Sequence, residues 1–368
     1  MTEIYLIRHA QAEGNLYRMM QGHWDGKVTE LGWKQIDALA ERFRDIHIDA
    51  VYSSDLYRTR MTAGAITRYH DIPLHTTAKL REINMGAWEA EFFANVNYSQ
   101  PEDVRKFIFE PSEWKIPGAE TYAQVAERAF PELERICRKH PGQVIAAVSH
   151  GVTIRCILSK ALGIDLKDVE QLPIVKNTAV TKLYYDKGSF SAEYINDYSH
   201  LDAVGGTAWS NTEEIRDENF DPASDAEYYK RCYADSWKVA HGNLDGFCAD
   251  VYLDAAISHY RANPSAVKKL YIKEELVGLV DLDPERSAHM GCGWVTLLYL
   301  KDEYREKGLG IQVLARAISL YSKLGRSCIR LNVHEDNRSA VDFYEKHGFK
   351  ELSREGGLLL MEMKLGGK

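Results

Sequence analysis

The first half of the chain alternates short apolar runs with segments of helical periodicity, and this alternation restricts the folds that it can adopt. Apolar runs at residues 3–7, 50–52 and 144–148 predict strands. The run at 144–148 is unbroken, as expected of a strand that is covered on both faces. Two further runs at 178–185 and 189–195 predict a hairpin. Strands that alternate with helices in this way predict an α/β sandwich with a largely parallel sheet.

Three helices of this half have recognisable boundaries. Apolar residues recur at helical spacing after Thr29. Thr121 and Gln124 have the spacing of a capping box, which predicts that a helix begins there. Residues 152–162 are helical in pattern, and Gly163 is positioned to end that helix.

The strand-helix pattern breaks at Gly205-Gly206, and an acidic stretch without clear periodicity follows at residues 213–225. We therefore expect two domains, at residues 1–204 and 207–368.

The second half has a different order of elements. Ser224 and Glu227 predict the capped start of a helix, and a second helix ends before Asn263-Pro264. A hairpin, a long strand, a helix, a strand, a helix and a final strand follow, at about residues 269–282, 291–300, 308–325, 328–333, 338–347 and 358–363.

The composition excludes several classes of partner. Lys and Arg number 46 against 54 Asp and Glu, and the net charge of −8 disfavours nucleic acid and anionic membrane, which both need a basic face. No stretch approaches the roughly 18 apolar residues of a membrane span, and the first residues show no signal peptide. The 6 cysteines are scattered without a CxxC pair. We expect reduced thiols, neither a disulfide framework nor a zinc site, and a cytoplasmic protein.

Charged side chains follow three of the predicted strands. Arg8 and His9 follow the first, Arg58 the second, and His150 with Gly151 the unbroken run. Ligands of an open α/β sheet bind beyond the carboxyl ends of its strands, so we expect these side chains at one edge.

These residue types suit phosphoryl transfer. Two arginines and a cationic imidazole can hold the oxygens of a phosphate monoester, while a second, neutral imidazole attacks phosphorus. Glu82 is the candidate acid for the departing alkoxide. No metal-binding cluster accompanies these residues, so we expect no metal and assign its usual part to the arginines.

The motifs around these residues resemble the histidine phosphatase superfamily, in its phosphoglycerate mutase-like branch, over about residues 1–201. The resemblance implies a three-layer α/β sandwich with His9 as the phosphorylated nucleophile and Glu82 as the proton donor. The implied phosphate pocket consists of Arg8, Asn15, Arg58, His150 and Gly151.

Other segments refine this resemblance. Residues 28–32 and 118–121 match further family segments, and Ala10 stands where the family usually has glycine. A mutase must hold a bisphosphate, but the cap region at residues 89–117 is aromatic and carries three basic against six acidic residues. Hydrolysis is therefore favoured, and a phosphoglycerate mutase-type phosphotransferase is the alternative.

The segment from Leu298 to Gly310 predicts a second anion site. A strand leads into a helix whose first turn contains Arg-x-x-Gly-x-Gly, where glycines let backbone N–H groups approach an anion such as a pyrophosphate. Together with residues 328–333, Asn337 and residues 340–349, this segment resembles the GNAT-type N-acetyltransferases, over about residues 207–365. The resemblance implies an α+β domain that binds acetyl-CoA as its cofactor.

The family resemblance also implies roles for single residues. The backbones of Leu298 and Leu300 would align the pantetheine and acetyl groups, Asn337 would contact the pantetheine arm, and Tyr344 would protonate the leaving thiolate. The implied pyrophosphate loop comprises Arg305, Gly308, Leu309 and Gly310.

The base that deprotonates the amine is not identified. We expect solvated loop positions for Asp281, Asp283 and His289, and we leave His334 and Glu335 undecided. The chain is then bifunctional, acting on a small-molecule phosphate monoester and on a small-molecule or peptide amine. The alternative is a phosphatase with an acyl-CoA-binding regulatory module.

Overall fold

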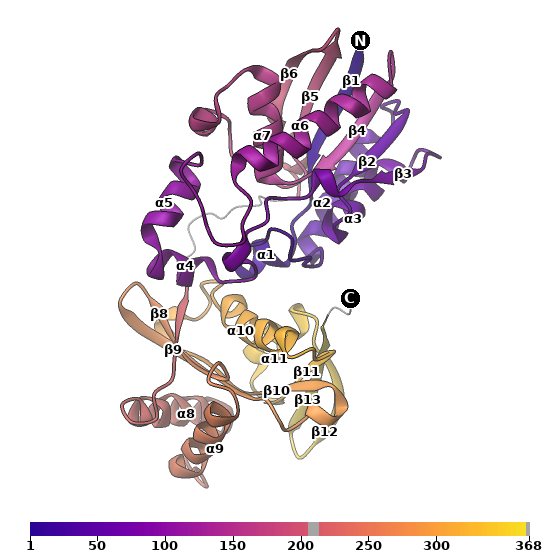
Figure 1. The fold of residues 1–368 in the computed structure, drawn as a ribbon. Coiled ribbons are helices and arrows are strands. Elements are labelled where there is room, and N and C mark those ends of the chain that lie inside the picture. The colour runs from indigo at the N-terminus through magenta and orange to yellow at the C-terminus, as the bar shows by residue number, and fades with distance from the viewer. Residues whose placement is uncertain (205–212, 366–368) are drawn as a thin grey trace. The chain divides into compact units, whose positions relative to one another are not determined.

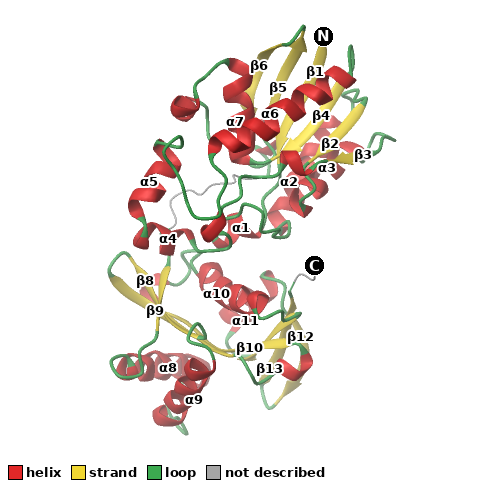
Figure 2. Ribbon diagram, in the orientation of Figure 1, coloured by secondary structure: helices red, strands yellow, loops and turns green. Residues whose placement is uncertain are grey.

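A computed structural model of the protein describes residues 1–204 and 213–365. The chain divides into two compact units, Met1–Asn211 and Thr212–Lys368, each with its own sheet (Figures 1 and 2). The expected domain boundary after residue 204 falls on residues outside those described. No described helix has both the length and the apolar character needed to cross a membrane.

The N-terminal unit contains a six-stranded sheet in the order β3-β2-β4-β1-β5-β6. The first four strands in this order are parallel, and β5 and β6 form an antiparallel hairpin, as predicted. The strands are β1 (Thr2–Arg8), β2 (Ala50–Ser53), β3 (Leu74–Thr76), β4 (Val144–Ser149), β5 (Val180–Asp186) and β6 (Ser189–Asp197).

Helices cover both faces of this sheet, which confirms the three-layer sandwich (Figure 1). Successive β1 residues alternate between two cores: Ile4 and Leu6 pack on the side of α6 and α7, and Tyr5 and Ile7 on the side of α2 and α3. The helices are α1 (Glu13–Tyr17), α2 (Glu30–Phe43), α3 (Tyr57–Thr67), α4 (Phe93–Ser99), α5 (Pro101–Phe109), α6 (Tyr122–Lys139) and α7 (Gly151–Leu162).

The predicted boundaries of these helices are confirmed. Thr29 Oγ1 accepts a hydrogen bond from Gly32 N, and Thr121 forms the capping box with Gln124. Gly163 ends α7 in the left-handed conformation that glycine tolerates best, with φ of 70°.

The C-terminal unit contains a seven-stranded sheet in the order β12-β13-β11-β10-β9-β8-β7. Its strands are antiparallel except for the central pair of β10 and β11. The strands are β7 (Arg216–Asn219), β8 (Val267–Ile272), β9 (Glu275–Asp283), β10 (Cys292–Leu300), β11 (Cys328–His334), β12 (Lys350–Glu355) and β13 (Leu358–Lys364). The helices are α8 (Ala226–His241), α9 (Ala249–Ala262), α10 (Gly310–Lys323) and α11 (Arg338–Lys346).

Two local predictions for this unit are wrong. Ser224 does not cap α8, because its hydroxyl donates to Asp221 and the N-cap residue is Asp225. The acidic stretch at residues 213–225, which we expected to be irregular, contains the edge strand β7. Its residues Arg216–Asn219 lack an apolar alternation, and backbone pairing with β8 defines the strand.

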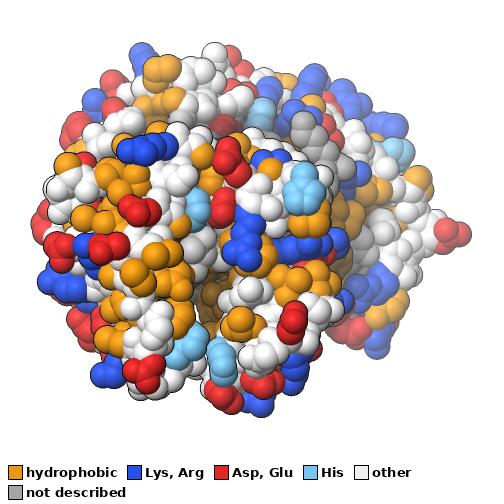
Figure 3. Space-filling model, turned by 90° about the horizontal axis from the view of Figure 1, so that it is seen from below, with side chains coloured by type: hydrophobic (Ala, Val, Ile, Leu, Met, Phe, Trp, Pro, Cys, Tyr) orange, Lys and Arg blue, Asp and Glu red, His pale blue; other side chains and the backbone are white. Residues whose placement is uncertain are grey.

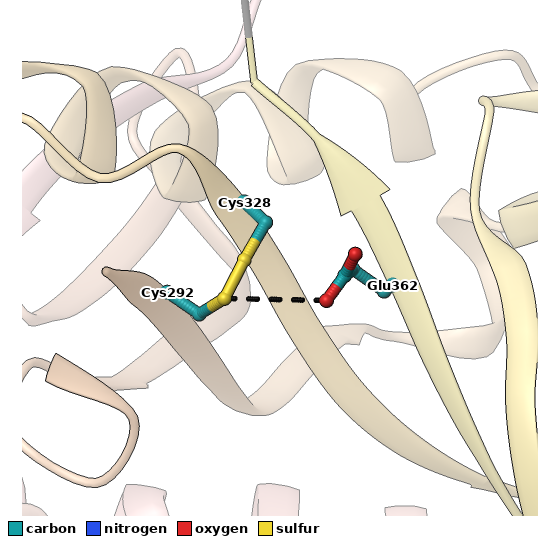
Figure 4. A group of neighbouring side chains, drawn as sticks. All are labelled: Cys292, Cys328 and Glu362. Atoms are coloured by element: carbon teal, nitrogen blue, oxygen red, sulfur yellow. Dashed lines mark hydrogen bonds between the residues drawn. A yellow bond between two sulfur atoms is a disulfide. The ribbon is translucent and has the colours of Figure 1, made fainter. Parts of the chain in front are cut away.

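The expectation of reduced thiols is wrong for one pair of cysteines. Parallel pairing of β10 with β11 places Cys292 opposite Cys328, and a disulfide joins them (Figure 4). Glu362 lies beside the disulfide, which makes this the one group with metal-site spacing among residues 1–204 and 213–365. The group does not fit a metal, because the sulfurs are bonded to each other and Glu362 is bonded to Arg330 and Lys364.

Candidate active sites

The N-terminal site forms where neighbouring strands end. Because β1 lies beside β4 with Arg8 opposite Ser149, the two strands place His9 and His150 side by side. Their ring centroids are 5.2 Å apart. Strand β2 lies on the other side of β4, and α3 after it carries the fully buried Arg58. Four side chains from three chain segments thus meet at one sheet edge.

His9 is held in one tautomer and is kept neutral. Its Nδ1 lies 2.7 Å from the carbonyl oxygen of Ala10, so Nδ1 carries the proton and Nε2 keeps its lone pair. Burial lowers the pKa of His9 well below its usual value, and the charges of Arg58 and Arg8 lower it further. A neutral imidazole with a free Nε2 is a competent nucleophile.

His150 is also neutral in this arrangement, contrary to the cationic state we expected from sequence. Burial and the nearby Arg58 and His9 lower its pKa well below the usual value. Its Nε2 lies 3.0 Å from Ser54 Oγ, while its Nδ1 is buried without a partner in the described chain. A dianion beside this ring would favour the charged form.

Both arginines keep part of their hydrogen-bonding capacity unused. Arg58 donates to the carbonyl oxygens of Gly22 and Trp24 at 2.7 and 2.9 Å, and Arg8 donates to that of Val175. The Nε atoms of both arginines are buried and have no partner among the described residues. Burial lowers the pKa of Arg58 to about 10, so the group stays charged at neutral pH. Buried donors without partners are rare, and a bound oxyanion would satisfy them.

Glu82 approaches the same site from the loop between β3 and α4. Its carboxylate accepts backbone hydrogen bonds from Ile83, Val152 and Thr153, at 3.0 to 3.2 Å. A methyl group added to Gly151 would lie 3.5 Å from Arg8 Nε and 3.8 Å from Glu82 Oε2. The carboxylate therefore stands beside the guanidinium that would hold a phosphate.

Asn15 and Ala10 lie close to the nucleophile. Asn15 Oδ1 accepts a hydrogen bond from Ala12 N at 3.1 Å and lies 3.4 Å from Asn177 Nδ2. Ala10 is buried, has a negative φ and donates its N–H to Thr62, so this position does not require glycine.

Sequence reasoning missed the residues that hold this constellation in place. Glu89 accepts the N–H groups of Gly22, His23 and Trp24, and thereby fixes the loop whose carbonyl groups bind Arg58. Glu89 belongs to a segment that the sequence had singled out, but its loop partners carry no recognisable pattern.

Three more residues were missed. Ser54 contacts His150, and Asn177 donates to the carbonyl of His9 at 2.9 Å. Arg128 of α6 donates to the carbonyl of Glu82 at 2.9 Å and pairs with Glu120 at 2.7 Å. An arginine on an amphipathic helix looks solvated in sequence, so nothing there indicated this position.

The C-terminal site forms where two parallel strands separate. The register of β10 with β11 runs from Cys292 opposite Cys328 to Val295 opposite Leu331 and then stops, and a bulge follows Val295 in the pairing of β10 with β9. Beyond this point the two strands line a cavity of about 480 Å³. We call this gap the fork.

Three of the predicted residues line the fork: Leu298, Asn337 and Tyr344. Asn337 caps α11 by accepting a hydrogen bond from Ala340 N at 3.2 Å. Burial raises the pKa of Tyr344 to about 12, so its phenol is protonated at neutral pH and can act as a proton donor.

The other predicted residues lie outside the lining of the fork. Leu300 ends β10, and Arg305 donates to its carbonyl oxygen at 2.9 Å. Gly308 has φ of +74°, Leu309 is buried at the N-cap of α10, and Gly310 packs so closely on Phe343 that a Cβ would lie 2.9 Å from its ring.

The candidate bases occupy different environments. Asp281 is fully buried and accepts hydrogen bonds from Tyr229 and His259, both at 2.7 Å, so the expected solvated position is wrong. Asp283 is 3.3 Å from Nε2 of His259. Burial alone would lower the pKa of His259, but the hydrogen bond and charge of Asp281, together with Asp283, raise it.

The remaining candidates differ in their access to the fork. His289 is exposed, and Glu335 is paired with Arg354 at 2.7 Å. His334 lines the fork.

Comparison with known proteins identifies the families. The model of the histidine phosphatase superfamily (branch 1) matches residues 4–198, which is more than half of the chain. The chain belongs to the histidine phosphatase superfamily. The model of the acetyltransferase (GNAT) family matches residues 226–349, so the chain also carries a GNAT domain.

Similar proteins include both phosphatases and mutases. Phosphoserine phosphatase 1 of Hydrogenobacter thermophilus is 34% identical over 166 residues, which cover 45% of this chain and 79% of that protein. A probable phosphoglycerate mutase, GpmB of Shigella boydii, is 30% identical over 209 residues, covering 55% of this chain and 96% of that protein.

Solved structures agree on the fold. Bacillus stearothermophilus YhfR superposes with a TM-score of 0.53 at 28% identity, covering 55% of this chain and all of that one. A mycobacterial glucosyl-3-phosphoglycerate phosphatase superposes with a TM-score of 0.51 at 24% identity, over 53% of this chain and 99% of that one, and supports the fold alone.

Proposed function

We propose that the N-terminal domain hydrolyses phosphate monoesters through a phosphohistidine on His9. The observation that carries this proposal is the group of three buried nitrogen atoms, on Arg8, Arg58 and His150, that have no partner among the described residues and lie around the neutral ring of His9. This arrangement leaves donors and a nucleophile available to one tetrahedral anion.

The proposed reaction has two steps. Nε2 of His9 attacks phosphorus, the bond from phosphorus to the ester oxygen breaks, and the leaving alkoxide takes a proton from Glu82. Water then gives a proton back to Glu82 and attacks the phosphohistidine, which releases phosphate and restores His9. Arg8 and Arg58 hold the charge of the transferring group in both steps.

The cap supports water rather than a second phosphate as the acceptor. Arg105 of α5 is bonded to both Glu102 and Glu110, so its charge is already neutralised. Trp88 and Trp114 are buried, and their ring centroids are 5.4 Å apart, which gives them a packing role. The similarity to a probable phosphoglycerate mutase keeps the mutase as the second candidate.

A panel of phosphate monoesters, with amine-bearing members included, tests this proposal. We expect the wild type to release phosphate from at least one ester and to form an acid-labile phosphohistidine, and His9→Ala to do neither. Equal release by both proteins would remove His9 from the mechanism. Isomerisation stimulated by a bisphosphate, with little free phosphate, would instead establish the mutase.

For the C-terminal domain we propose acetyl transfer from acetyl-CoA to an amine. The chain's own residues would contribute the strand edges beside Leu298 and Leu300, the amides of residues 305–310 for the pyrophosphate, Asn337 for the pantetheine arm, and the Tyr344 phenol for the thiolate. Support comes from the fork, which brings Leu298, Asn337 and Tyr344 to one cavity. The nitrogen of the amine attacks the thioester carbon, the C–S bond breaks, and sulfur takes the proton of Tyr344. The nitrogen gives up one proton to solvent as the amide forms, and solvent returns a proton to the Tyr344 phenolate.

The release of free CoA thiol in the presence of amines tests acetyl transfer. The second candidate is an acyl-CoA-binding regulatory module. It would be favoured if acetyl-CoA raises the melting temperature of the wild type while no amine is acetylated.

The remaining proposals concern the whole chain. We infer that residues 1–204 and 207–368 form the two domains, that both act on small molecules without a metal, and that the protein is cytoplasmic. The net charge of −8 supports the absence of nucleic-acid partners.

A further inference from the structure

One wall of the fork takes no part in the proposed binding of acetyl-CoA. Helices α8 and α9 contribute aromatic side chains to this wall, and their rings stack on one another. The ring centroids of Tyr233 and Tyr252 are 4.1 Å apart at an interplanar angle of 20°, and those of Trp237 and His241 are 3.9 Å apart at 17°. Figure 3 shows hydrophobic side chains gathered along a narrow hollow with histidine side chains at its edge. This wall offers aromatic side chains to a ligand.

The guanidinium group of Arg286 lies in the same cavity as the aromatic wall, which consists of Tyr233, Trp237, His241 and Tyr252. The guanidinium carbon of Arg286 lies 3.7 Å from the ring centroid of Trp294, and both residues line the fork. Stacking on an indole holds the guanidinium plane in position, although the side chain is exposed on its other side. Arg286 also lines an adjoining hollow of about 470 Å³.

No described residue neutralises this cation. Within residues 1–204 and 213–365, the one hydrogen bond of Arg286 to a side chain runs from its backbone N–H to Asp283 Oδ1, at 3.0 Å. The carboxylate of Asp283 is already engaged by His259 and by the N–H of Glu285. The carboxylate of Glu285 is exposed on the adjoining hollow and makes no ion pair within the described part of the chain. The guanidinium N–H groups of Arg286 are therefore available to a ligand.

We propose that Arg286 anchors an anionic group, a carboxylate or a phosphate, of the amine that receives the acetyl group. The guanidinium would bind this group through two parallel hydrogen bonds, and the rest of the acceptor would lie against the aromatic wall. The amine would then lie in the same cavity as Leu298 and Tyr344. This inference rests on the acetyl transfer proposed above and names its substrate class.

Matched probes with one scaffold test the proposal. We would use 4-(aminomethyl)benzoate, its neutral carboxamide, and the corresponding phosphonate with the full-length protein. Arg286→Gln removes the charge. Arg286→Lys keeps the charge but loses the paired N–H donors of the guanidinium group. Arg261→Gln is the matched control, since Arg261 is an exposed arginine on α9 outside both hollows.

Binding is measured without turnover, as the melting temperature of the protein saturated with CoA. We expect at least one anionic probe to bind the wild type about tenfold more tightly than the carboxamide, a preference of about 1.4 kcal/mol. Arg286→Gln should remove this preference and leave carboxamide binding unchanged, Arg286→Lys should keep part of it, and Arg261→Gln should keep all of it. The preferred probe identifies the group as carboxylate or phosphate.

Two results would overturn the proposal: equal binding of anionic and neutral probes by the wild type, or loss of both classes of probe in Arg286→Gln. Failure of acetyl transfer itself is a separate outcome. It would leave the anion preference intact in the CoA complex, while no free thiol appears with acetyl-CoA.

Discussion

The two candidate sites both lie between neighbouring parallel strands. The N-terminal site is built from side chains at the strand ends, whereas the C-terminal site also uses the backbone edges of its strands. In the N-terminal unit, β1 and β4 stay paired up to Arg8 and Ser149, and the side chains of two arginines and two histidines gather where the strands end. In the C-terminal unit, β10 and β11 separate after Val295 and Leu331, and strand edges and aromatic rings line the gap.

This difference predicts how each site responds to substitution. A site whose charge comes from a few buried side chains loses transition-state stabilisation when one of them is removed. A site that binds its ligand through backbone groups tolerates the loss of a side chain better, because every residue still offers its N–H and C=O.

The largest expected effect is that of Arg58→Gln. Phosphate release should fall by about 10²–10³-fold in kcat/KM, because a preorganised charged donor is lost. Arg60→Gln, on an exposed residue of the same helix, should leave the rate unchanged. A rate above one tenth of the wild type, with the fold intact by thermal melting, would contradict the assigned role.

Tyr344→Phe should have a smaller effect on the second site. We expect acetyl transfer to slow by up to about 10²-fold, since water can partly replace the phenol as proton donor. The rise in melting temperature caused by acetyl-CoA should persist. Tyr260→Phe, outside the fork, serves as the control. Loss of acetyl-CoA binding in Tyr344→Phe would show that the tyrosine mainly shapes the cavity.

Glu89 is predicted to be a positioning residue. Removing its carboxylate in Glu89→Ala frees the loop that binds Arg58 and should lower kcat/KM by about tenfold. Glu89→Gln keeps one acceptor oxygen and should recover part of the loss. A purely structural residue would lower the melting temperature without changing the kinetics of the folded enzyme.

The smallest effect concerns the pH dependence of stability in the C-terminal unit. The pKa of folded His259 is raised above its unfolded value of about 6.5, so its pairing with Asp281 and Asp283 stabilises fully below that pH. The contribution is lost as the pH rises through the folded pKa.

The melting temperature of this unit measures the effect. It should fall as the pH rises from about 6.5 through the folded pKa of His259, and His259→Gln should abolish this fall. His289→Gln, which replaces an exposed histidine, should leave the fall in melting temperature unchanged. A wild-type fall that His259→Gln leaves unaltered would assign the effect elsewhere.

Residues whose own side chains carry chemistry were the most predictable part of the molecule. Arg8, His9, Arg58 and His150 could be placed at one edge because parallel strands end there together. The carbonyl groups that bind Arg58 could not be predicted, since any residue offers a carbonyl.

Features that depend on tertiary pairing were also inaccessible from sequence. The Cys292–Cys328 disulfide depends on the neighbourhood of β10 and β11, and strand β7 depends on an edge that β8 offers. The same holds for Asp281, whose burial follows from contacts with Tyr229 and His259.

The Cys292–Cys328 bond stands at the first residue pair of β10 and β11, and the strands part four residues further on. A covalent bond at this end of the pair prevents β10 and β11 from separating there. Beyond Val295 and Leu331 each strand is still paired on its outer side, β10 with β9 and β11 with β13. A wider gap between β10 and β11 would therefore require these outer pairs to bend as well.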